Sequence, residues 1–435
     1  KVNFIMETKI LLERINDIVD HFVFSSVSKH AKLWPNIQDT TICGPCKYKI
    51  VKIGRITFNR ENVIGKGVEG TVYRGTFARE RVVKVNENLL NVTCANIVRF
   101  YYFDENKFSF YLCMELCDCN LEVFICQYPK EVPKDGFKQI LEGLKVLHNN
   151  KFLHRDLKPS NVLVKKEKTE EGKLIVLKLS DFSLAKETDD EMSVISGLYI
   201  GTEGWIPPEI HQGTEVKPSN IVVNASADIF ACGMLGYYVV SGGQMLYNSQ
   251  EAINHDINQG NADYSNLHDP TTKDIVRAMT CRDESKRPNA KMCLKHPCHW
   301  DSARVFEYFK VVNDTIVSVD VHIKTQVSNA LNQNPHQVFQ SDWKSRLTPL
   351  VKNELFTAPR SSTRPKYNEF NVTDLIRAIR NTKEHFLQMK HLHNELGNNK
   401  NDLHAYWTGL FPYLLIHTYT TLKPMTMYGE LQHYY

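Results

Sequence analysis

The sequence predicts an α+β protein built from three parts in series: a sheet-rich lobe, a helical lobe and a separate all-α domain. Short apolar runs that alternate with polar residues occur within residues 55–119 and indicate strands. Patterns with the 3.6-residue period of helices dominate residues 120–297. Residues 298–435 keep the helical period but contain many His and Tyr residues, which indicates a domain of its own.

The composition limits the class of protein. At 435 residues the chain exceeds a typical domain of about 100–200 residues, so more than one unit is expected. A formal charge of +4 excludes a histone-like polycation, and 42% hydrophobic residues exclude a disordered chain. No run approaches the roughly 18 apolar residues of a membrane span, so we expect no membrane contact within this chain. Eleven cysteines, an odd number, fit a reducing compartment better than a disulfide framework.

Residues 1–54 form a leader whose role the sequence leaves open. A helical pattern that ends at Phe22 is followed by a turn-rich stretch containing the tetrapeptide Cys43–Cys46. The tetrapeptide is similar to the thioredoxin redox motif, which works at a helix start after a core strand. No such unit is predicted here, so a chance match is favoured. Because no charged-then-apolar leader is present, we expect a fragment rather than a signal-bearing precursor.

A glycine-rich loop between strand-like runs predicts a phosphate-binding site. Glycines let backbone N–H groups approach phosphate oxygens closely. The next strand-like run carries Lys84, whose ammonium group can pair with nucleotide phosphates. The loop follows the pattern G-x-G-x-x-G-x-V, with its marked residues at Gly65, Gly67, Gly70 and Val72.

A second motif, His154–Asn161, supplies groups for phosphoryl transfer. Asp156 can accept the proton of a hydroxyl group, and Lys158 can contact the moving phosphoryl group. Asn161, and Asp181 20 residues later, offer oxygen ligands to a metal ion. Since the motifs follow one another in a fixed order and spacing, the alternative that these acids are merely solvated loop residues is not favoured.

Together these motifs resemble the eukaryotic protein kinase fold over roughly residues 55–297. The resemblance implies a bilobal fold that binds ATP or ADP with Mg²⁺, with backbone groups of Glu115 and Cys117 contacting the adenine. It also implies a structural ion pair between Glu209 and Arg287, and phosphate acceptors on the loop that precedes Glu209. The candidate acceptors are Thr188, Ser193 and Ser196.

Two departures from this family bear on phosphotransfer. Only 11 residues separate Lys84 from Asn96, where the family has a helix whose glutamate orients the lysine. Either that helix is absent or residues are missing from the sequence. Ser183 stands where the family has glycine, and serine adopts a positive φ only at a cost. We therefore expect nucleotide binding to be retained and phosphotransfer to be weak.

The third part contains a helix with polar groups on one face. Asn371 is the predicted N-cap. Asn381 and His385 lie four residues apart and share a face, with Arg380 beside them and Arg377 one turn earlier. From residue types alone such a face is most often ordinary surface, but it suits a phosphodiester better than a metal ion. The expected core stripe of the helix is Val372, Leu375, Ile376 and Ile379.

Three blocks resemble the inositol-requiring enzyme family of endoplasmic-reticulum stress sensors: Asp374–His385, Phe411–Tyr419 and, in the helical lobe, Gly201–Ile206. The similarity runs from about Val51 to the end of the chain. The resemblance implies a kinase joined to a kinase-extension nuclease domain on the cytosolic face of the endoplasmic reticulum membrane, with the membrane span outside this chain. Ribonuclease L shares the architecture, but Gly201–Ile206 and the intact His154–Asp156 favour the stress sensor.

The family's nuclease site falls on Tyr367, Arg380, Asn381 and His385. The resemblance implies cleavage of stem-loop RNA without a metal ion, and activation through a homodimer or higher oligomer. Cleavage through the 2′-hydroxyl needs a base, an acid and phosphate donors, for which we assign Tyr367, His385, and Arg380 with Asn381. Thr382 replaces a lysine that is common in the family, and Lys383 is the candidate substitute.

Two other functions stay open beside an endoribonuclease controlled by a nucleotide-binding Ser/Thr kinase lobe in the unfolded protein response. One is a Ser/Thr kinase with a non-catalytic scaffold tail, and the other is an adaptor without either activity. The four matching tail residues argue against the adaptor. The short segment after Lys84 argues against the kinase alone.

Overall fold

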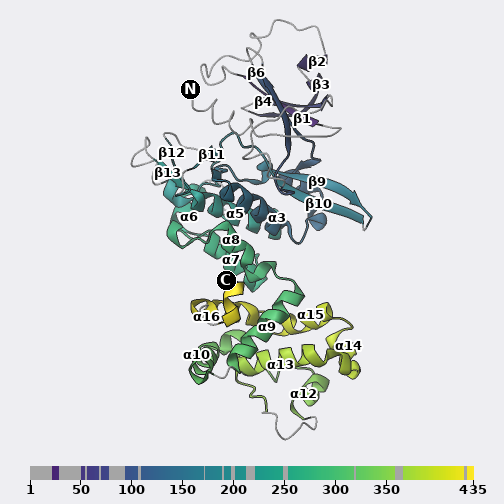
Figure 1. Cartoon of the computed structure of the whole chain (residues 1–435), viewed down its shortest axis with the longest axis vertical. Coiled ribbons are helices and arrows are strands. Elements are labelled where there is room, and N and C mark those ends of the chain that lie inside the picture. The colour runs from purple at the N-terminus through teal and green to yellow at the C-terminus, as the bar shows by residue number, and fades with distance from the viewer. Residues whose placement is uncertain are drawn as a thin grey trace. The chain divides into compact units, whose positions relative to one another are not determined.

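The computed structural model describes residues 22–28, 50–53, 56–67, 70–77, 94–105, 109–170, 172–188, 191–196, 201–211, 221–247, 253–317, 320–357, 366–425 and 429–435. They divide into two compact units. The first unit runs to Ala262 and includes Thr280–Ala290, and the second comprises Asp263–Met279 and Lys291–Tyr435. The sheets lie in the first unit and the second is helical, which confirms the predicted α+β class (Figure 1).

A six-stranded antiparallel sheet begins the first unit, in the order β2-β3-β4-β1-β6-β5. The strands are β1 (Phe22–Ser28), β2 (Ile50–Ile53), β3 (Ile56–Gly67), β4 (Gly70–Phe77), β5 (Phe100–Glu105) and β6 (Ser109–Glu115). β3 and β4 form a hairpin that pairs Gly67 with Gly70 at its tip. β1 pairs with β4 on one side and β6 on the other, so the leader supplies an inner strand of this sheet.

The helical lobe of the first unit is built around two packed helices, α3 (Gly136–Asn149) and α5 (Ala225–Val240). α5 is apolar on nearly all sides and is therefore buried, and the Asn224 side chain caps it by accepting from Ser226 N–H. Gly236 allows the close approach of α3, because a Cβ there would lie 2.4 Å from the Phe137 ring. The other elements of this lobe are α2 (Leu121–Gln127), α6 (Ile253–Gln259), β7 (Cys119–Asn120), β8 (Phe152–Leu153), β11 (Lys186–Glu187), β12 (Ser193–Ser196) and β13 (Ile221–Asn224).

The hairpin of β9 (Val162–Thr169) and β10 (Gly172–Leu179) brings two distant parts of the sequence together. The strands pair along their whole length, with Val162 opposite Leu179 (Figure 1). β9 starts directly after Asn161, and β10 ends two residues before Asp181. The antiparallel return of the chain therefore sets these predicted metal ligands at the same end of the hairpin.

The second unit packs helices around α9 (Ser302–Ile316) and α13 (Val372–His385). The predicted core stripe of α13 is confirmed, since all four of its side chains are buried. Asn371 is the residue before α13, but its side chain makes no capping bond; Asn332 Oδ1 accepts from Thr373 N–H instead, at 3.3 Å. The remaining helices are α7 (Pro270–Met279), α8 (Ala290–Lys295), α10 (Val321–Asn332), α11 (His336–Phe339), α12 (Pro349–Phe356), α14 (His393–Leu396), α15 (Lys400–Leu410) and α16 (Leu414–Leu422). In the part of the chain that the structure describes, no helix has both the length and the apolar character needed to cross a bilayer.

Candidate functional sites

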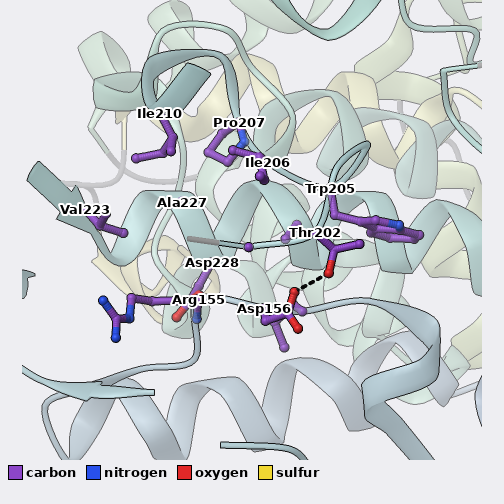
Figure 2. A pocket seen from close by; sticks show the side chains of 13 residues that line it. Arg155, Asp156, Thr202, Trp205, Ile206, Pro207, Ile210, Val223, Ala227 and Asp228 are labelled. Atoms are coloured by element: carbon purple, nitrogen blue, oxygen red, sulfur yellow. Dashed lines mark hydrogen bonds between the residues drawn. The ribbon is translucent and has the colours of Figure 1, made fainter. Parts of the chain in front are cut away.

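The carboxylate of Asp156 is held by three side chains of the first unit. Its Oδ2 accepts hydrogen bonds from Lys158 Nζ (2.8 Å) and Asn161 Nδ2 (2.9 Å). Its Oδ1 accepts from the Thr202 hydroxyl at 2.6 Å, and Lys158 Nζ also donates to that hydroxyl at 2.6 Å. Figure 2 shows Thr202 and Asp156 facing each other. The structure thus brings together three predicted residues and adds Thr202, whose only signal in the sequence was its place in the Gly201–Ile206 block.

Asp228 of α5 fixes the backbone of the loop that carries Asp156. Its Oδ2 accepts from the backbone N–H of His154 and its Oδ1 from that of Arg155, each at 2.8 Å, and Oδ2 also lies 3.0 Å from His148 Nε2. Burial alone would raise the pKa of Asp228, but the hydrogen bond to His148 and the other donors hold it below its usual range. A cavity of about 30 Å³ lies beside this loop (Figure 2). It has room for little more than water and is too small for a nucleotide.

Asp181 lies at the end of the β9–β10 hairpin with an exposed side chain and a φ of 58°. The next residue, Phe182, turns its ring toward Phe100 and His154, with centroid distances of 5.7 and 5.2 Å. Ser183 does not have a positive φ. The expectation of a conformational cost at Ser183 is therefore wrong, because Asp181 adopts the left-handed conformation instead.

Asn161 and Asp181 suit the Mg²⁺ ion that accompanies a nucleotide. Asn161 is buried, and its amide nitrogen donates to both the backbone and the side chain of Asp156, which leaves the amide oxygen for a ligand. Among the described residues, the exposed Asp181 carboxylate accepts one long bond, 3.4 Å, from Ser183 N–H. Carboxylate and amide oxygens are the donors that Mg²⁺ prefers in proteins. These two residues would hold the ion.

The predicted adenine contacts lie at the end of β6. The backbone N–H of Glu115 already donates to Arg99 O at 2.7 Å, so its carbonyl is the group left for adenine. The buried Glu115 carboxylate forms ion pairs with Lys165 and with Lys178 Nζ, the latter at 3.2 Å. Burial raises the pKa of the Cys117 thiol to about 12, so this side chain stays protonated and only its backbone suits adenine.

The predicted phosphate contacts are described in part. Gly65 and Gly67 end β3, and Gly70 and Val72 begin β4, so the four residues lie at or near one hairpin tip. Lys84 lies outside the described residues, as does the segment that follows it up to residue 93.

The loop of candidate phosphate acceptors is partly ordered by pairing. Thr188 is buried, and its hydroxyl donates to Lys151 O at 3.0 Å, so it is not placed to accept a phosphoryl group. Ser193 and Ser196 lie on β12, which pairs with β13 just before α5. These two serines remain the candidate acceptors.

In the second unit, a chain of hydrogen bonds joins three of the four predicted nuclease residues. Arg380 Nη1 donates to Asn381 Oδ1 at 3.0 Å, and Asn381 Nδ2 donates to the Tyr367 hydroxyl at 2.9 Å. His385 lies one turn further along α13 and meets Gln388 Oε1 through Nδ1 at 3.0 Å. Its Nε2 is therefore the ring nitrogen left for a substrate.

The Tyr367 ring is enclosed by aromatic side chains, and only 7% of the residue is exposed. Trp343 and Phe356 meet the ring edge-on, at centroid distances of 5.9 and 6.0 Å. Trp343 Nε1 also donates to Asn368 O at 3.0 Å, which fixes the backbone beside the tyrosine. The aromatic side chains surround the ring, and the hydroxyl of Tyr367 contacts Asn381.

A protein-family profile described as Protein kinase domain matches residues 58–299, more than half of the chain. The chain belongs to the protein kinase family. Within this kinase, a second profile, Ribonuclease 2-5A, matches residues 305–435.

The names of two relatives of this kinase give both a kinase and an endoribonuclease activity, and a third relative is named as a sensor. The chain is 28% identical to the human serine/threonine-protein kinase/endoribonuclease IRE2 over 417 residues, which cover 89% of this chain and 43% of the human protein. It is 29% identical to the serine/threonine-protein kinase/endoribonuclease ire-1 of Caenorhabditis elegans over 419 residues, covering 88% and 41%. The Schizosaccharomyces pombe sensor for unfolded proteins in the ER, ire1, is 28% identical over 437 residues, covering 87% and 39%. This kinase therefore spans about two-fifths of the length of these relatives, and its resemblance to the inositol-requiring enzyme family is confirmed.

Two positions beside the kinase's tail site bear on the lysine that is common in the family, which Thr382 replaces here. Thr382 is 1% exposed and its hydroxyl donates to Ala378 O at 2.7 Å, so it serves the interior of the helix bundle. Lys383 Nζ forms an ion pair with Glu384 at 2.8 Å. The charge of Lys383 is therefore partly neutralised by its neighbour.

Proposed function

We propose that the tail of this kinase is an endoribonuclease that cleaves stem-loop RNA in the unfolded protein response, and that the nucleotide-binding lobe controls it. The observation that supports this most is the hydrogen-bonded chain Arg380–Asn381–Tyr367 with His385 on the same helix. The names of the relatives add support, since they join kinase and endoribonuclease. We place the activity at the cytosolic face of the endoplasmic reticulum membrane, by analogy with the stress-sensing relative.

The chemistry we assign is attack of an RNA 2′-hydroxyl on the adjacent phosphorus. A 2′-oxygen–phosphorus bond forms and the bond from phosphorus to the 5′-oxygen breaks, which leaves a 2′,3′-cyclic phosphate. The Tyr367 hydroxyl is held beside Asn381 by the Asn381 bond, and we assign to it the assisting role in removal of the 2′ proton. His385 would protonate the departing 5′-oxygen.

Arg380 and Asn381 suit the phosphate. Asn381 uses one of its two amide N–H donors on Tyr367, and the second can meet a phosphate oxygen. Arg380 uses Nη1 on Asn381, and its buried Nε has no hydrogen-bond partner among the described residues. A buried donor without a partner is uncommon, and it supports a ligand at this guanidinium group.

The direct test is to incubate the protein with a stem-loop RNA in EDTA, beside the His385→Ala variant. We expect cleavage by the unmodified protein, 2′,3′-cyclic phosphate ends, and little cleavage by the variant. Loss of cleavage in EDTA while the protein remains folded would mean that a metal ion does the work, and the assigned roles would be wrong.

The oligomeric state is part of the proposal. We expect a homodimer or higher oligomer to be the active form, so RNA cleavage per molecule should rise with protein concentration. A flat dependence across the micromolar range would instead indicate a self-sufficient monomer.

The second candidate function is Ser/Thr protein kinase activity, and the network around Asp156 favours it. Lys158 and Thr202 hold the carboxylate where a hydroxyl substrate would need it. We expect weak self-phosphorylation. Incorporation of labelled phosphate without any RNA cleavage would favour the kinase with a scaffold tail over the endoribonuclease.

A further inference from the structure

Tyr367 lies on a stretch, Lys366–Asn368, that belongs to no helix or strand. No ladder of backbone hydrogen bonds therefore fixes its position, although the proposed reaction requires its hydroxyl to lie within a fraction of an ångström of the right place. Side chains must hold this stretch. Trp343 does so on one side, through its bond to Asn368 O.

Arg377 of α13 holds the other side of the same stretch. Its guanidinium carbon lies 4.7 Å from the centre of the Tyr367 ring, in a cation–π contact. Its Nη2 donates to Lys366 O at 2.9 Å, immediately before the tyrosine. The same nitrogen is 3.0 Å from Asp374 Oδ1, and Asp374 Oδ2 accepts from Asn368 N–H at 2.7 Å. Arg377 and Asp374 thus contact the tyrosine ring and the backbone on both sides of it.

We infer that Arg377 is a positioning residue for Tyr367 and not an RNA-binding cation; this inference rests on the proposed endoribonuclease function. The charge of Arg377 is paired with Asp374, one of its nitrogens is bonded to the backbone, and its flat surface meets the ring. Its side chain is only 21% exposed. Arg380, by contrast, donates through Nη1 to the side chain of Asn381 and not to the backbone beside the tyrosine.

The planar guanidinium group is essential to this role. It stacks on the tyrosine while an edge nitrogen reaches both a carbonyl and a carboxylate. A lysine presents a single rounded ammonium group, which cannot make the stack and the edge contacts together. We therefore expect Arg377→Lys to behave like Arg377→Met rather than to restore activity.

The test is a double-mutant cycle in RNA cleavage between Arg377→Met and Tyr367→Phe. Phenylalanine keeps the ring and removes the hydroxyl. The position of the ring should therefore no longer affect the reaction in the Tyr367→Phe variant. We expect Arg377→Met alone to lower kcat by roughly ten- to a hundredfold, with KM within about twofold. In the Tyr367→Phe background, Arg377→Met should lower kcat no further.

The matched control is Arg346→Met. Arg346 also donates to a backbone carbonyl, Leu410 O at 2.9 Å, and also lies over an aromatic ring, Phe411 at 6.0 Å, but it contacts none of the four nuclease residues in the described structure. We expect it to lower thermal stability while leaving kcat within about twofold, since it removes a hydrogen bond to the backbone and an aromatic contact away from the nuclease residues.

A second readout separates failure of this inference from failure of the proposed function. With 3-fluorotyrosine incorporated, the Tyr367 resonance is the one lost in Tyr367→Phe. Arg377→Met should shift or broaden it and Arg346→Met should not. A raised KM with unchanged kcat, or losses that multiply in the double variant, would overturn the positioning role in favour of direct RNA contact. If the unmodified protein cleaves no RNA, the proposed function fails, and an unmoved fluorine resonance would still overturn the inference by itself.

Discussion

Arg287 places Nη1 and Nη2 on the two carboxylate oxygens of Glu209, at 2.7 and 2.8 Å. The guanidinium side chain has no exposed surface and also donates to the carbonyl oxygens of Cys281 and Ser226. The pairing expected from the sequence is confirmed. It ties the residues before α5 to the start of α5 and to the Thr280–Ala290 segment of the first unit.

Arg287→Ala should destabilise the first unit by about 3–5 kcal/mol, because removing one partner of a buried ion pair leaves the other uncompensated. Arg287→Lys should lose most of the same stability, since lysine cannot bind both oxygens at once. The free energy of unfolding in urea measures this. The neighbouring Lys286 is mostly exposed and forms an exposed ion pair with Asp283, so Lys286→Ala should change stability by less than about 0.5 kcal/mol. Equal losses in the two alanine variants would contradict a structural role for the pair.

The two activities should separate by mutation. Asp156→Asn should abolish self-phosphorylation on Ser193 and Ser196 while leaving RNA cleavage largely in place. His385→Ala should do the reverse, with a loss of cleavage of about a hundredfold or more, the usual scale of general acid catalysis. Phosphate incorporation and RNA cleavage would be measured on the same preparations. Asp156→Asn could instead abolish RNA cleavage while nucleotide binding and dimerisation stay normal. That result would mean that phosphorylation, and not nucleotide occupancy, controls RNA cleavage.

Nucleotide should stabilise the protein. A ligand that binds only the folded form adds about 2.7 kcal/mol at a hundredfold excess over its Kd. We therefore expect millimolar Mg-ADP to raise the melting temperature, and Asp181→Asn to reduce the rise, because it replaces a metal-binding carboxylate. A melting temperature that Mg-ADP leaves unchanged would count heavily against the nucleotide site.

Stability should fall in acid partly through Glu115. Burial alone would raise the pKa of this carboxyl group, but the hydrogen bond to Lys165 and the charge of Lys178 outweigh burial and hold the pKa below its ordinary value of 4.5. A lowered pKa in the folded state stabilises the protein above pH 4.5, and this contribution disappears as the pH falls from there through the lower folded value.

Glu115→Gln tests this pH dependence in urea unfolding. The difference in stability between the unmodified protein and the variant should be largest near neutral pH and should shrink as the pH falls below 4.5. Glu170→Gln, at the exposed end of the β9–β10 hairpin, controls for the loss of one negative charge. If the stability difference between the two proteins stayed constant from pH 7 to pH 3, the ion pairs would not lower the pKa of Glu115 in the folded protein.

The sequence patterns predicted the features that depend on residues close together in the chain. The stripe of α13 follows from the helical period, and the Asp156 loop and Asp181 follow from motifs of fixed spacing. Contacts between distant residues could not be predicted in this way. Thr202 reaches Asp156 from 46 residues away, and Asn332 takes the capping role expected of Asn371 from 39 residues away.

The strand β1 shows the same limit. The leader pattern predicted a helix that ends at Phe22, most of which lies outside the described residues, and it did not predict the strand Phe22–Ser28 that follows. Its conformation is decided by pairing with β4 and β6, which lie far along the chain. Likewise, the residue types of Tyr367 and Arg377 did not predict that the guanidinium group packs on the tyrosine ring. That contact depends on the path of Lys366–Asn368 along α13.

The second unit takes in α7 although α7 falls within the stretch matched as a kinase domain. α7 packs on α16, and its Asp274 lies 3.2 Å from His296, whose ring meets Tyr419 of α16 at 5.2 Å. The chain enters this unit at Asp263, leaves it after Met279 and returns at Lys291. If recombination between related genes exchanged residues 291–435 without α7, α16 would pack against an α7 from a different protein. The unit that is inherited together is therefore larger than residues 305–435, and α7 and α16 are expected to change together as the lineage diverges.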